Sequence, residues 1–181
     1  NIAAGNGLTT YASEQDPDGD GILTIFDSNP YPCNSGYQQI DNVCVEVSPG
    51  SYSINGVVNV CDYGSYQPLA GQSYCLYASP GNYVNNTNSS EQMPCVAGTY
   101  QNDSGQISCI ENSPGYYTDT QSAENQEKCP TGTYQPNSGS QDCIITDAGH
   151  FTNNRKSVSQ TPCPPGTYQP LTGQNNCLSA D

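Results

Sequence analysis

The spacing of its ten cysteines is the feature that most limits what this chain can fold into. From Cys61 to Cys177 the intervals between consecutive cysteines alternate between 14 and 20 residues, which gives a repeat of 34 residues. Because the number of cysteines is even, all of them can pair, in five disulfide bonds. A periodic series of disulfides predicts an array of small units rather than one large hydrophobic core.

The amino-acid composition supports this interpretation. Leu, Ile, Val and Phe make up only 26 of 181 residues, and the formal net charge is −14. Such a composition is typical of disordered chains, which cannot bury enough apolar surface to fold. Disulfides supply the missing constraint and persist in oxidising compartments. The sequence therefore predicts a secreted protein that is extracellular or at the cell surface.

Each 34-residue repeat contains two unequal half-units. The short one reads C-x2-G-x-Y-Q-x3-G-x3-C, starting at Cys61 and recurring three times, and Cys33 begins a shortened copy. The long one reads approximately P-G-x-Y-x9-Q-x2-C, as in the segment 80–95. Every half-unit thus starts with Gly-x-aromatic, and glycine allows turns that are closed to other residues. We expect these glycines and aromatic residues to be scaffold.

These patterns predict a small disulfide-rich protein that is mostly β or irregular, an elongated linear repeat rod of short hairpins with little helix. Glycine and proline together number 32 residues, and no apolar period of 3.6 residues is present. The predicted segments are an N-terminal arm (1–15), a calcium-binding loop (16–32), an atypical first cysteine-rich repeat (33–60), three full repeats (61–94, 95–128 and 129–162) and a C-terminal half-repeat (163–181).

Parity and loop length favour disulfides within the short half-units. This pairing leaves no free thiol and closes loops of constant length from Cys61 onward. Pairing across the long half-units is the alternative, and it would leave Cys33 and Cys177 free to cross-link neighbouring subunits. The favoured pairs are Cys33–Cys44, Cys61–Cys75, Cys95–Cys109, Cys129–Cys143 and Cys163–Cys177.

The opening of the last short half-unit, residues 163–169, reads C-P-P-G-T-Y-Q. It resembles the cysteine-rich repeats shared by ephrin-receptor-like, GCC2/GCC3-type and tumour-necrosis-factor-receptor-like modules, and the resemblance covers about residues 33–177. In those families a second cysteine commonly precedes the Pro-Gly step, so this chain has fewer disulfides per unit. The residues near that position here are Ser48, Ser79, Ser113 and Asp147.

An acidic loop precedes the first repeat. Residues 16–27 read D-P-D-G-D-G-I-L-T-I-F-D, with oxygen donors at the ligand positions of a twelve-residue calcium loop. The candidate ligands are Asp16, Asp18, Asp20, the carbonyl of Ile22, Thr24 and Asp27. The segment resembles a thrombospondin type 3 repeat, which implies that calcium stiffens the junction with the first cysteine-rich repeat. The alternative is a solvated acidic turn, because Asp and Gly favour turns.

Charge and motif content exclude several functions. The three basic residues all lie after position 127, which argues against binding of nucleic acid or anionic lipid. No apolar stretch approaches about 18 residues, so we expect no direct membrane insertion. The sequence contains no nucleophile elbow, phosphate-binding loop or zinc-type cluster, so we expect no enzymatic activity.

Three N-glycosylation sequons begin at Asn85, Asn88 and Asn102, which suggests a glycoprotein. For function, the sequence favours a calcium-stabilised, disulfide-linked structural protein that self-assembles head to tail with other copies of itself into a surface filament or appendage. The alternative is a receptor or adhesin ectodomain whose cysteine-rich repeats bind a protein or glycan ligand.

Overall fold

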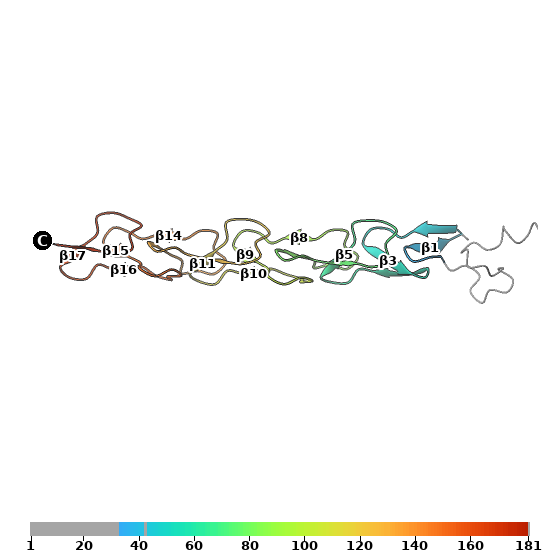
Figure 1. Ribbon diagram of the computed structural model, residues 1–181, viewed down its shortest axis with the longest axis horizontal. Coiled ribbons are helices and arrows are strands. Elements are labelled where there is room, and N and C mark those ends of the chain that lie inside the picture. The colour runs from blue at the N-terminus through green and yellow to red at the C-terminus, as the bar shows by residue number, and fades with distance from the viewer. Residues whose placement is uncertain (1–32, 42, 181) are drawn as a thin grey trace, which may run out of the picture. The chain divides into compact units, whose positions relative to one another are not determined.

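The computed structural model describes residues 33–41 and 43–180. Within these residues there is no helix, and the strands form nine two-stranded antiparallel sheets. Figure 1 shows short strands joined by long loops along the chain. The predicted fold class, a small disulfide-rich repeat protein of short β-hairpins, is therefore confirmed. The predicted N-terminal arm and calcium-binding loop lie outside the described residues.

Each half-unit of the sequence forms one hairpin. The hairpins are β1 (Tyr37–Ile40) with β2 (Val43–Glu46), β3 (Ser51–Ile54) with β4 (Val57–Val60), β5 (Ser65–Tyr66) with β6 (Leu76–Tyr77), β7 (Asn82–Tyr83) with β8 (Met93–Pro94), β9 (Thr99–Tyr100) with β10 (Ile110–Glu111), β11 (Tyr116–Tyr117) with β12 (Glu127–Lys128), β13 (Thr133–Tyr134) with β14 (Ile144–Ile145), β15 (His150–Phe151) with β16 (Thr161–Pro162), and β17 (Thr167–Tyr168) with β18 (Leu178–Ser179).

The first two hairpins have longer strands than the others because their turns are shorter. In β3–β4 the two turn residues are Asn55 and Gly56, whose φ angles are +50° and +79°. Two residues with positive φ make the tight turn that matches strand twist, and Asn-Gly is its preferred sequence. The strands can then pair over four residues, whereas the strands of the later hairpins pair over two and enclose a longer loop.

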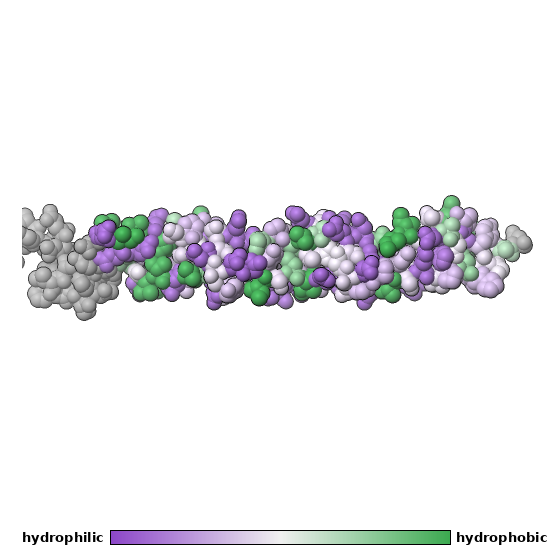
Figure 2. All heavy atoms as spheres, turned by 180° about the vertical axis from the view of Figure 1, so that it is seen from behind, coloured by the Kyte–Doolittle hydropathy of each residue, from purple (hydrophilic) through white to green (hydrophobic). Residues whose placement is uncertain are grey.

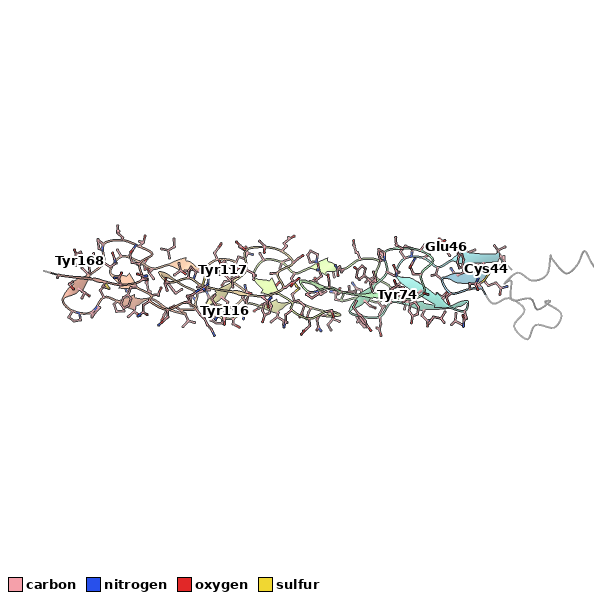
Figure 3. The ribbon with its side chains drawn as sticks, viewed as in Figure 1. Cys44, Glu46, Tyr74, Tyr116, Tyr117 and Tyr168 are labelled. Atoms are coloured by element: carbon pink, nitrogen blue, oxygen red, sulfur yellow. A yellow bond between two sulfur atoms is a disulfide. The ribbon has the colours of Figure 1, made fainter. Side chains whose placement is uncertain are left out.

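The cysteines pair as the favoured local scheme predicts, with each disulfide joining the two ends of a short half-unit. The Cα–Cα distances lie between 5.5 and 5.8 Å. In the four full-length copies of the short half-unit, one cysteine lies three residues before the starting glycine and the other lies eleven residues after it. Figure 3 shows the side chains along the chain, with sulfur in yellow.

The chain divides into two compact units. Of the described residues, the first contains 33–41, 43–62, 66–76 and 87–91, and the second contains 63–65, 77–86 and 92–180. Within the second unit, each half-unit donates a backbone hydrogen bond to the next. Gly98 N–H donates to Thr118 O at 2.9 Å, and Gly115 N–H donates to Gln135 O at 2.8 Å. Backbone hydrogen bonds thus connect neighbouring repeats.

The interior is built mainly from small and polar side chains. In four short half-units, a glutamine stands three residues after the starting glycine, and each of these side chains is at most 6% exposed. In each, the amide nitrogen donates to a backbone carbonyl seven residues later, as Gln101 does to Ser108 O at 2.8 Å. The buried apolar residues are Cys33, Val47, Cys61, Ala78, Val84, Cys95 and Cys129. The low aliphatic content of the sequence agrees with this interior.

Glycine is required where one half-unit contacts the second one after it. Gly98 has a φ of +88°, and a Cβ atom added there would overlap the carbonyl oxygen of Gly139. The carbonyl can approach only because glycine has no side chain. The recurring glycines are therefore scaffold, as expected from the sequence.

Candidate protein-interaction surface

The tips of the two longer hairpins carry exposed aliphatic pairs. In β1–β2, Ile40 lies opposite Val43, and in β3–β4, Ile54 lies opposite Val57. Their exposed fractions range from 49% for Ile40 to 64% for Val57. Residues directly opposite each other in a hairpin share one face, so each tip presents two adjacent aliphatic side chains.

Strand alternation extends this aliphatic surface beyond the tips. Val45 shares its face of β1–β2 with Ile40 and Val43 and is 42% exposed, whereas Val58 and Val60 lie on the opposite face of β3–β4 from Ile54. We call the surface formed by the two tip pairs and Val45 the tip surface; its members are Ile40, Val43, Val45, Ile54 and Val57, and it excludes Val58 and Val60.

Hydrogen bonds hold the two hairpins against each other. Gly36 N–H donates to Ser53 O at 3.0 Å, and the Ser53 hydroxyl, which is fully buried, donates to Tyr37 O at 2.7 Å. Figure 2 shows hydrophobic groups in green over the end of the described chain that holds β1–β4. The tip surface therefore comes from two hairpins in fixed contact.

The repeat scaffold does not require this surface. The position of Ile40 and Ile54, four residues after the starting glycine, is polar or proline in the later half-units, as at Asn102, Asp119 and Pro136. A concentration of exposed aliphatic side chains that the scaffold does not need is typical of a protein-interaction site.

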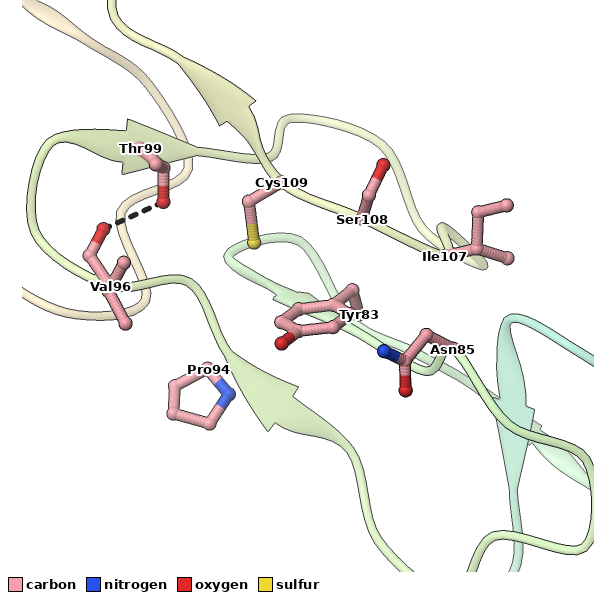
Figure 4. A pocket seen from close by; sticks show the side chains of 8 residues that line it. All are labelled: Tyr83, Asn85, Pro94, Val96, Thr99, Ile107, Ser108 and Cys109. Atoms are coloured by element: carbon pink, nitrogen blue, oxygen red, sulfur yellow. Dashed lines mark hydrogen bonds between the residues drawn. The ribbon is translucent and has the colours of Figure 1, made fainter. Parts of the chain in front are cut away.

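A shallow pocket lies in the second unit, between the hairpins β7–β8 and β9–β10. Its volume is about 320 Å³. Figure 4 shows the Tyr83 ring in the middle of the lining side chains, with Asn85 beside it. The lining residues are Tyr83, Asn85, Pro94, Val96, Thr99, Ile107, Ser108 and Cys109.

The lining of this pocket is particular to one repeat. Thirty-four residues later, the positions of Asn85, Pro94 and Ile107 are occupied by Asp119, Lys128 and Gln141. The equivalent surface of the next repeat is therefore charged and polar. The uncharged lining of the pocket is a local feature of residues 83–109, not a consequence of the repeat.

The three basic residues of the chain, Lys128, Arg155 and Lys156, surround the strand β11. The Lys156 ammonium lies 4.9 Å from the centre of the Tyr116 ring, and Lys128 lies opposite Tyr116 in the hairpin. This is a cation–π contact. Figure 3 labels both Tyr116 and Tyr117.

The neighbouring Tyr117 hydroxyl donates to a carboxylate oxygen of Glu127 at 3.1 Å. This hydrogen bond is the main cause of a raised pKa of Tyr117. Desolvation and the negative charges of Glu127 and Asp119 raise the pKa further, while the positive charge of Arg155 lowers it.

The candidate calcium ligands, from Asp16 to Asp27, lie outside the described residues. Among the described residues, no group of three or more His, Cys, Asp or Glu side chains is placed to hold a metal ion. The three sequon asparagines have exposed side chains. Asn85 lines the pocket, whereas Asn88 accepts a hydrogen bond from the Ser51 hydroxyl at 3.0 Å.

Sequence reasoning missed the function of a recurring glutamine. In three of the half-units without a disulfide, those that start at Gly81, Gly115 and Gly149, glutamine stands eleven residues after the starting glycine, where the half-units from Cys61 onward that have a disulfide place their second cysteine. Its side-chain oxygen accepts from the backbone N–H of Ser79, Ser113 or Asp147 at 2.7–2.8 Å. The glutamines are Gln92, Gln126 and Gln160.

The structure specifies the position of the missing first cysteine, near which the sequence has Ser79, Ser113 and Asp147. Three residues before the starting glycine stand Ala78, Asn112 and Thr146, all of them fully buried, rather than the following Ser79, Ser113 and Asp147. The spacing to the glycine, combined with the Gln-x2-Cys pattern, could have identified both positions. A hydrogen bond from a backbone N–H to the glutamine oxygen therefore replaces the absent disulfide.

Part of the chain is similar to a known protein family. Residues 81–129 and 127–163 match the family model described as tyrosine-protein kinase ephrin type A/B receptor-like. A search of curated proteins found no match to the chain. The family match and the five disulfides in repeated hairpins agree with the ephrin-receptor-like resemblance. They indicate an extracellular or cell-surface location. In the part of the chain that the structure describes, no helix could cross a membrane.

Proposed function

We propose that this chain is a cysteine-rich segment of an extracellular receptor or adhesin ectodomain that binds another protein through the tip surface. The observation that carries the proposal is the set of exposed aliphatic pairs at the tips of β1–β2 and β3–β4. Burial of these side chains against a partner would remove apolar area from water, which favours association by about 25 cal/mol per Å².

The sequence alone favours a filament subunit, whereas the family match supports a receptor-like ectodomain. The match covers residues 81–163, and its name refers to a class of receptors. A receptor-like repeat needs no catalytic group, since its task is to present a surface. The disulfides and the hydrogen bonds between half-units would keep that surface in a fixed conformation, which lowers the entropy lost on binding.

The tip surface fits a protein ligand better than a glycan ligand. Its side chains are Ile and Val, which offer no hydrogen bonds to sugar hydroxyls. The core of a protein interface, in contrast, is depleted of charge and built from apolar groups. We therefore infer a protein partner with an apolar patch of its own.

Binding to a panel of secreted and cell-surface ectodomain proteins tests this proposal. The variant I40T/V43T/V57T makes the tips polar but keeps β-branched side chains that favour strands. We expect a partner found with the unaltered chain to bind this variant at least tenfold more weakly. The matched control is I144T/I145T, which changes two exposed residues of the second unit and should bind normally.

The result that contradicts the proposal is equally specific. A partner that binds the tip variant as tightly as the unaltered chain, or that loses binding only in the I144T/I145T control, would place the interface elsewhere. Circular dichroism and mapping of the five disulfides establish that both variants remain folded.

A further inference from the structure

Asn85 differs from the other two sequon asparagines in what surrounds its side chain. It is the only one of the three that lines the pocket between β7–β8 and β9–β10. The sequence around it is Tyr83-Val84-Asn85-Asn86-Thr87, so an aromatic residue stands two positions before the asparagine. Tyr83 and Asn85 both line the pocket, whereas Val84 between them is buried.

The orientation of the Asn85 amide suits an attached sugar. Figure 4 shows its nitrogen turned toward the Tyr83 ring. The side-chain oxygen accepts a hydrogen bond from Asn86 Nδ2 at 3.0 Å, which leaves the nitrogen for a covalent bond. A substituent on this nitrogen would start beside the ring and extend over the pocket.

The pocket has the size and chemistry for one N-acetylhexosamine. Its volume, 320 Å³, is at the lower end of the range for ligand sites, about 300–1,000 Å³. The apolar face of a pyranose ring can stack on an aromatic ring such as Tyr83. Val96 and Ile107, which are 59% and 54% exposed, lie at opposite ends of the pocket in Figure 4 and would flank the sugar, and Ser108 also lines the pocket.

We propose that Asn85 carries an N-linked glycan and that its first N-acetylglucosamine occupies this pocket. In the transfer, a bond forms between Asn85 Nδ2 and C1 of the sugar, while the bond from C1 to the pyrophosphate of a lipid-linked oligosaccharide donor breaks. The amide nitrogen loses one proton, and the lipid pyrophosphate leaves. This inference requires passage through a eukaryotic secretory pathway and does not depend on which protein the tip surface binds.

Asn88 and Asn102 lack this arrangement. The Asn88 side chain accepts from Ser51, and its backbone has a φ of +56° where it packs against Gly50. Asn102 is exposed and follows the buried Gln101, outside the pocket lining. A glycan at either site would extend into solvent, so only the sugar on Asn85 is expected to become ordered.

The test uses the full chain, secreted from eukaryotic cells that make high-mannose glycans, with N88Q and N102Q in the background. An endoglycosidase trims the glycan to a single N-acetylglucosamine, and peptide mass spectrometry locates it. We expect modification of Asn85. Nuclear magnetic resonance should show upfield-shifted sugar protons and nuclear Overhauser effects from protons of the sugar to the Val96 and Ile107 methyl groups.

Ile107→Gln is the matched variant, because glutamine stands at the equivalent position, 141, of the next repeat. It should keep the glycan but weaken its contact with the pocket. On chains that keep the untrimmed glycan, peptide N-glycosidase should then release it roughly threefold to tenfold faster than from the chain with Ile107, the range expected for loss of a contact of this kind.

Three results would overturn the inference. These are an unmodified Asn85, sugar resonances at the shifts of a free glycan with no pocket contacts, and equal removal rates for the two chains. If the pocket of the glycosylated chain instead binds an apolar side chain of a partner protein, the sugar does not occupy it and the inference fails.

Discussion

At the scale of single residues, glycine is the residue that the fold can least replace. The glycine that starts a half-unit adopts a positive φ and also leaves room for a carbonyl oxygen of the second half-unit after it. Gly98 meets both conditions, whereas Gly166 has a φ of +81° and no atom within 4 Å of an added Cβ. A comparison of Gly98 with Gly166 therefore separates the need for a positive φ from the need for space beside a carbonyl oxygen.

We therefore expect G98A to destabilise the protein more than G166A. Alanine at Gly166 has only the cost of a left-handed conformation, about 1–2 kcal/mol. Alanine at Gly98 has the same cost and also overlaps Gly139 O, so the half-units that contain Gly98 and Gly139 must move apart. Thermal unfolding followed by circular dichroism measures both; equal midpoints for the two variants would mean that the close approach is unimportant.

Tyr117 provides a pH-dependent contribution at the same scale. Its hydrogen bond to Glu127 stabilises the neutral phenol and raises the pKa of Tyr117 above its ordinary value, about 10. The folded state therefore gains stability below that pH, and the gain is lost as the pH rises through the higher folded-state value.

The difference in ultraviolet phenolate absorbance between the unaltered chain and Y117F isolates this one tyrosine. We expect its titration midpoint above 10, and E127Q should lower the midpoint by removing the carboxylate. A midpoint that E127Q leaves unchanged would show that the hydrogen bond to Glu127 is not the cause.

At the scale of the elements, the scaffold alternates covalent and hydrogen-bonded closures of the same hairpin. Cys95 and Cys109 close β9–β10, while the equivalent positions of β7–β8 hold Ala78 and Gln92. Both kinds of half-unit make the same backbone hydrogen bonds to their neighbouring half-units. The hairpins without a disulfide should consequently open first on heating.

The double variant A78C/Q92C should form a sixth disulfide, because its cysteines occupy the positions of Cys95 and Cys109 one half-unit earlier. A closed loop of about 15 residues adds up to about 3 kcal/mol of stability. Q92A alone should instead lose about 1 kcal/mol with the hydrogen bond to Ser79. Non-reducing peptide mapping checks the pairing, and two free thiols in the double variant would contradict the proposed equivalence.

Cysteine spacing and glycine recurrence were sufficient to predict the hairpins and the local disulfides, because both depend on short-range chain geometry. The function of Gln92 was not predictable from its spacing to Cys95 alone, since its partner, the N–H of Ser79, is defined by the folded register. The tip surface could have been found from Ile54-Asn55-Gly56-Val57, a hairpin signal flanked by aliphatic residues.

The pocket at Tyr83 was beyond sequence reasoning for a different reason. It brings together residues from two hairpins, such as Tyr83 and Ile107, which are 24 positions apart. Ile107 differs from the polar residues at the equivalent positions, Ser73, Gln141 and Asn175, but only the three-dimensional arrangement shows that it shares a pocket with Tyr83.

At the scale of the whole molecule, calcium at the acidic loop 16–27 remains a prediction from the sequence. We expect calcium to raise the thermal stability of the segment that precedes the first repeat, because four carboxylates repel one another without a cation. Asp18→Ala should abolish the increase. Calorimetry with calcium or a chelator measures it, and identical curves in the two buffers would contradict a calcium site.

The central claim concerns how the molecule acts: as a separate ectodomain that presents its tip surface to another protein, not as a subunit of a filament. Sedimentation velocity of the purified chain in calcium, over a hundredfold range of concentration, tests it most directly. We expect one species with the mass of the monomer, 19.2 kDa plus any glycan, at every concentration. Larger species that grow with concentration, and that disappear in I40T/V43T/V57T, would identify the tip surface as a self-assembly interface and contradict the claim.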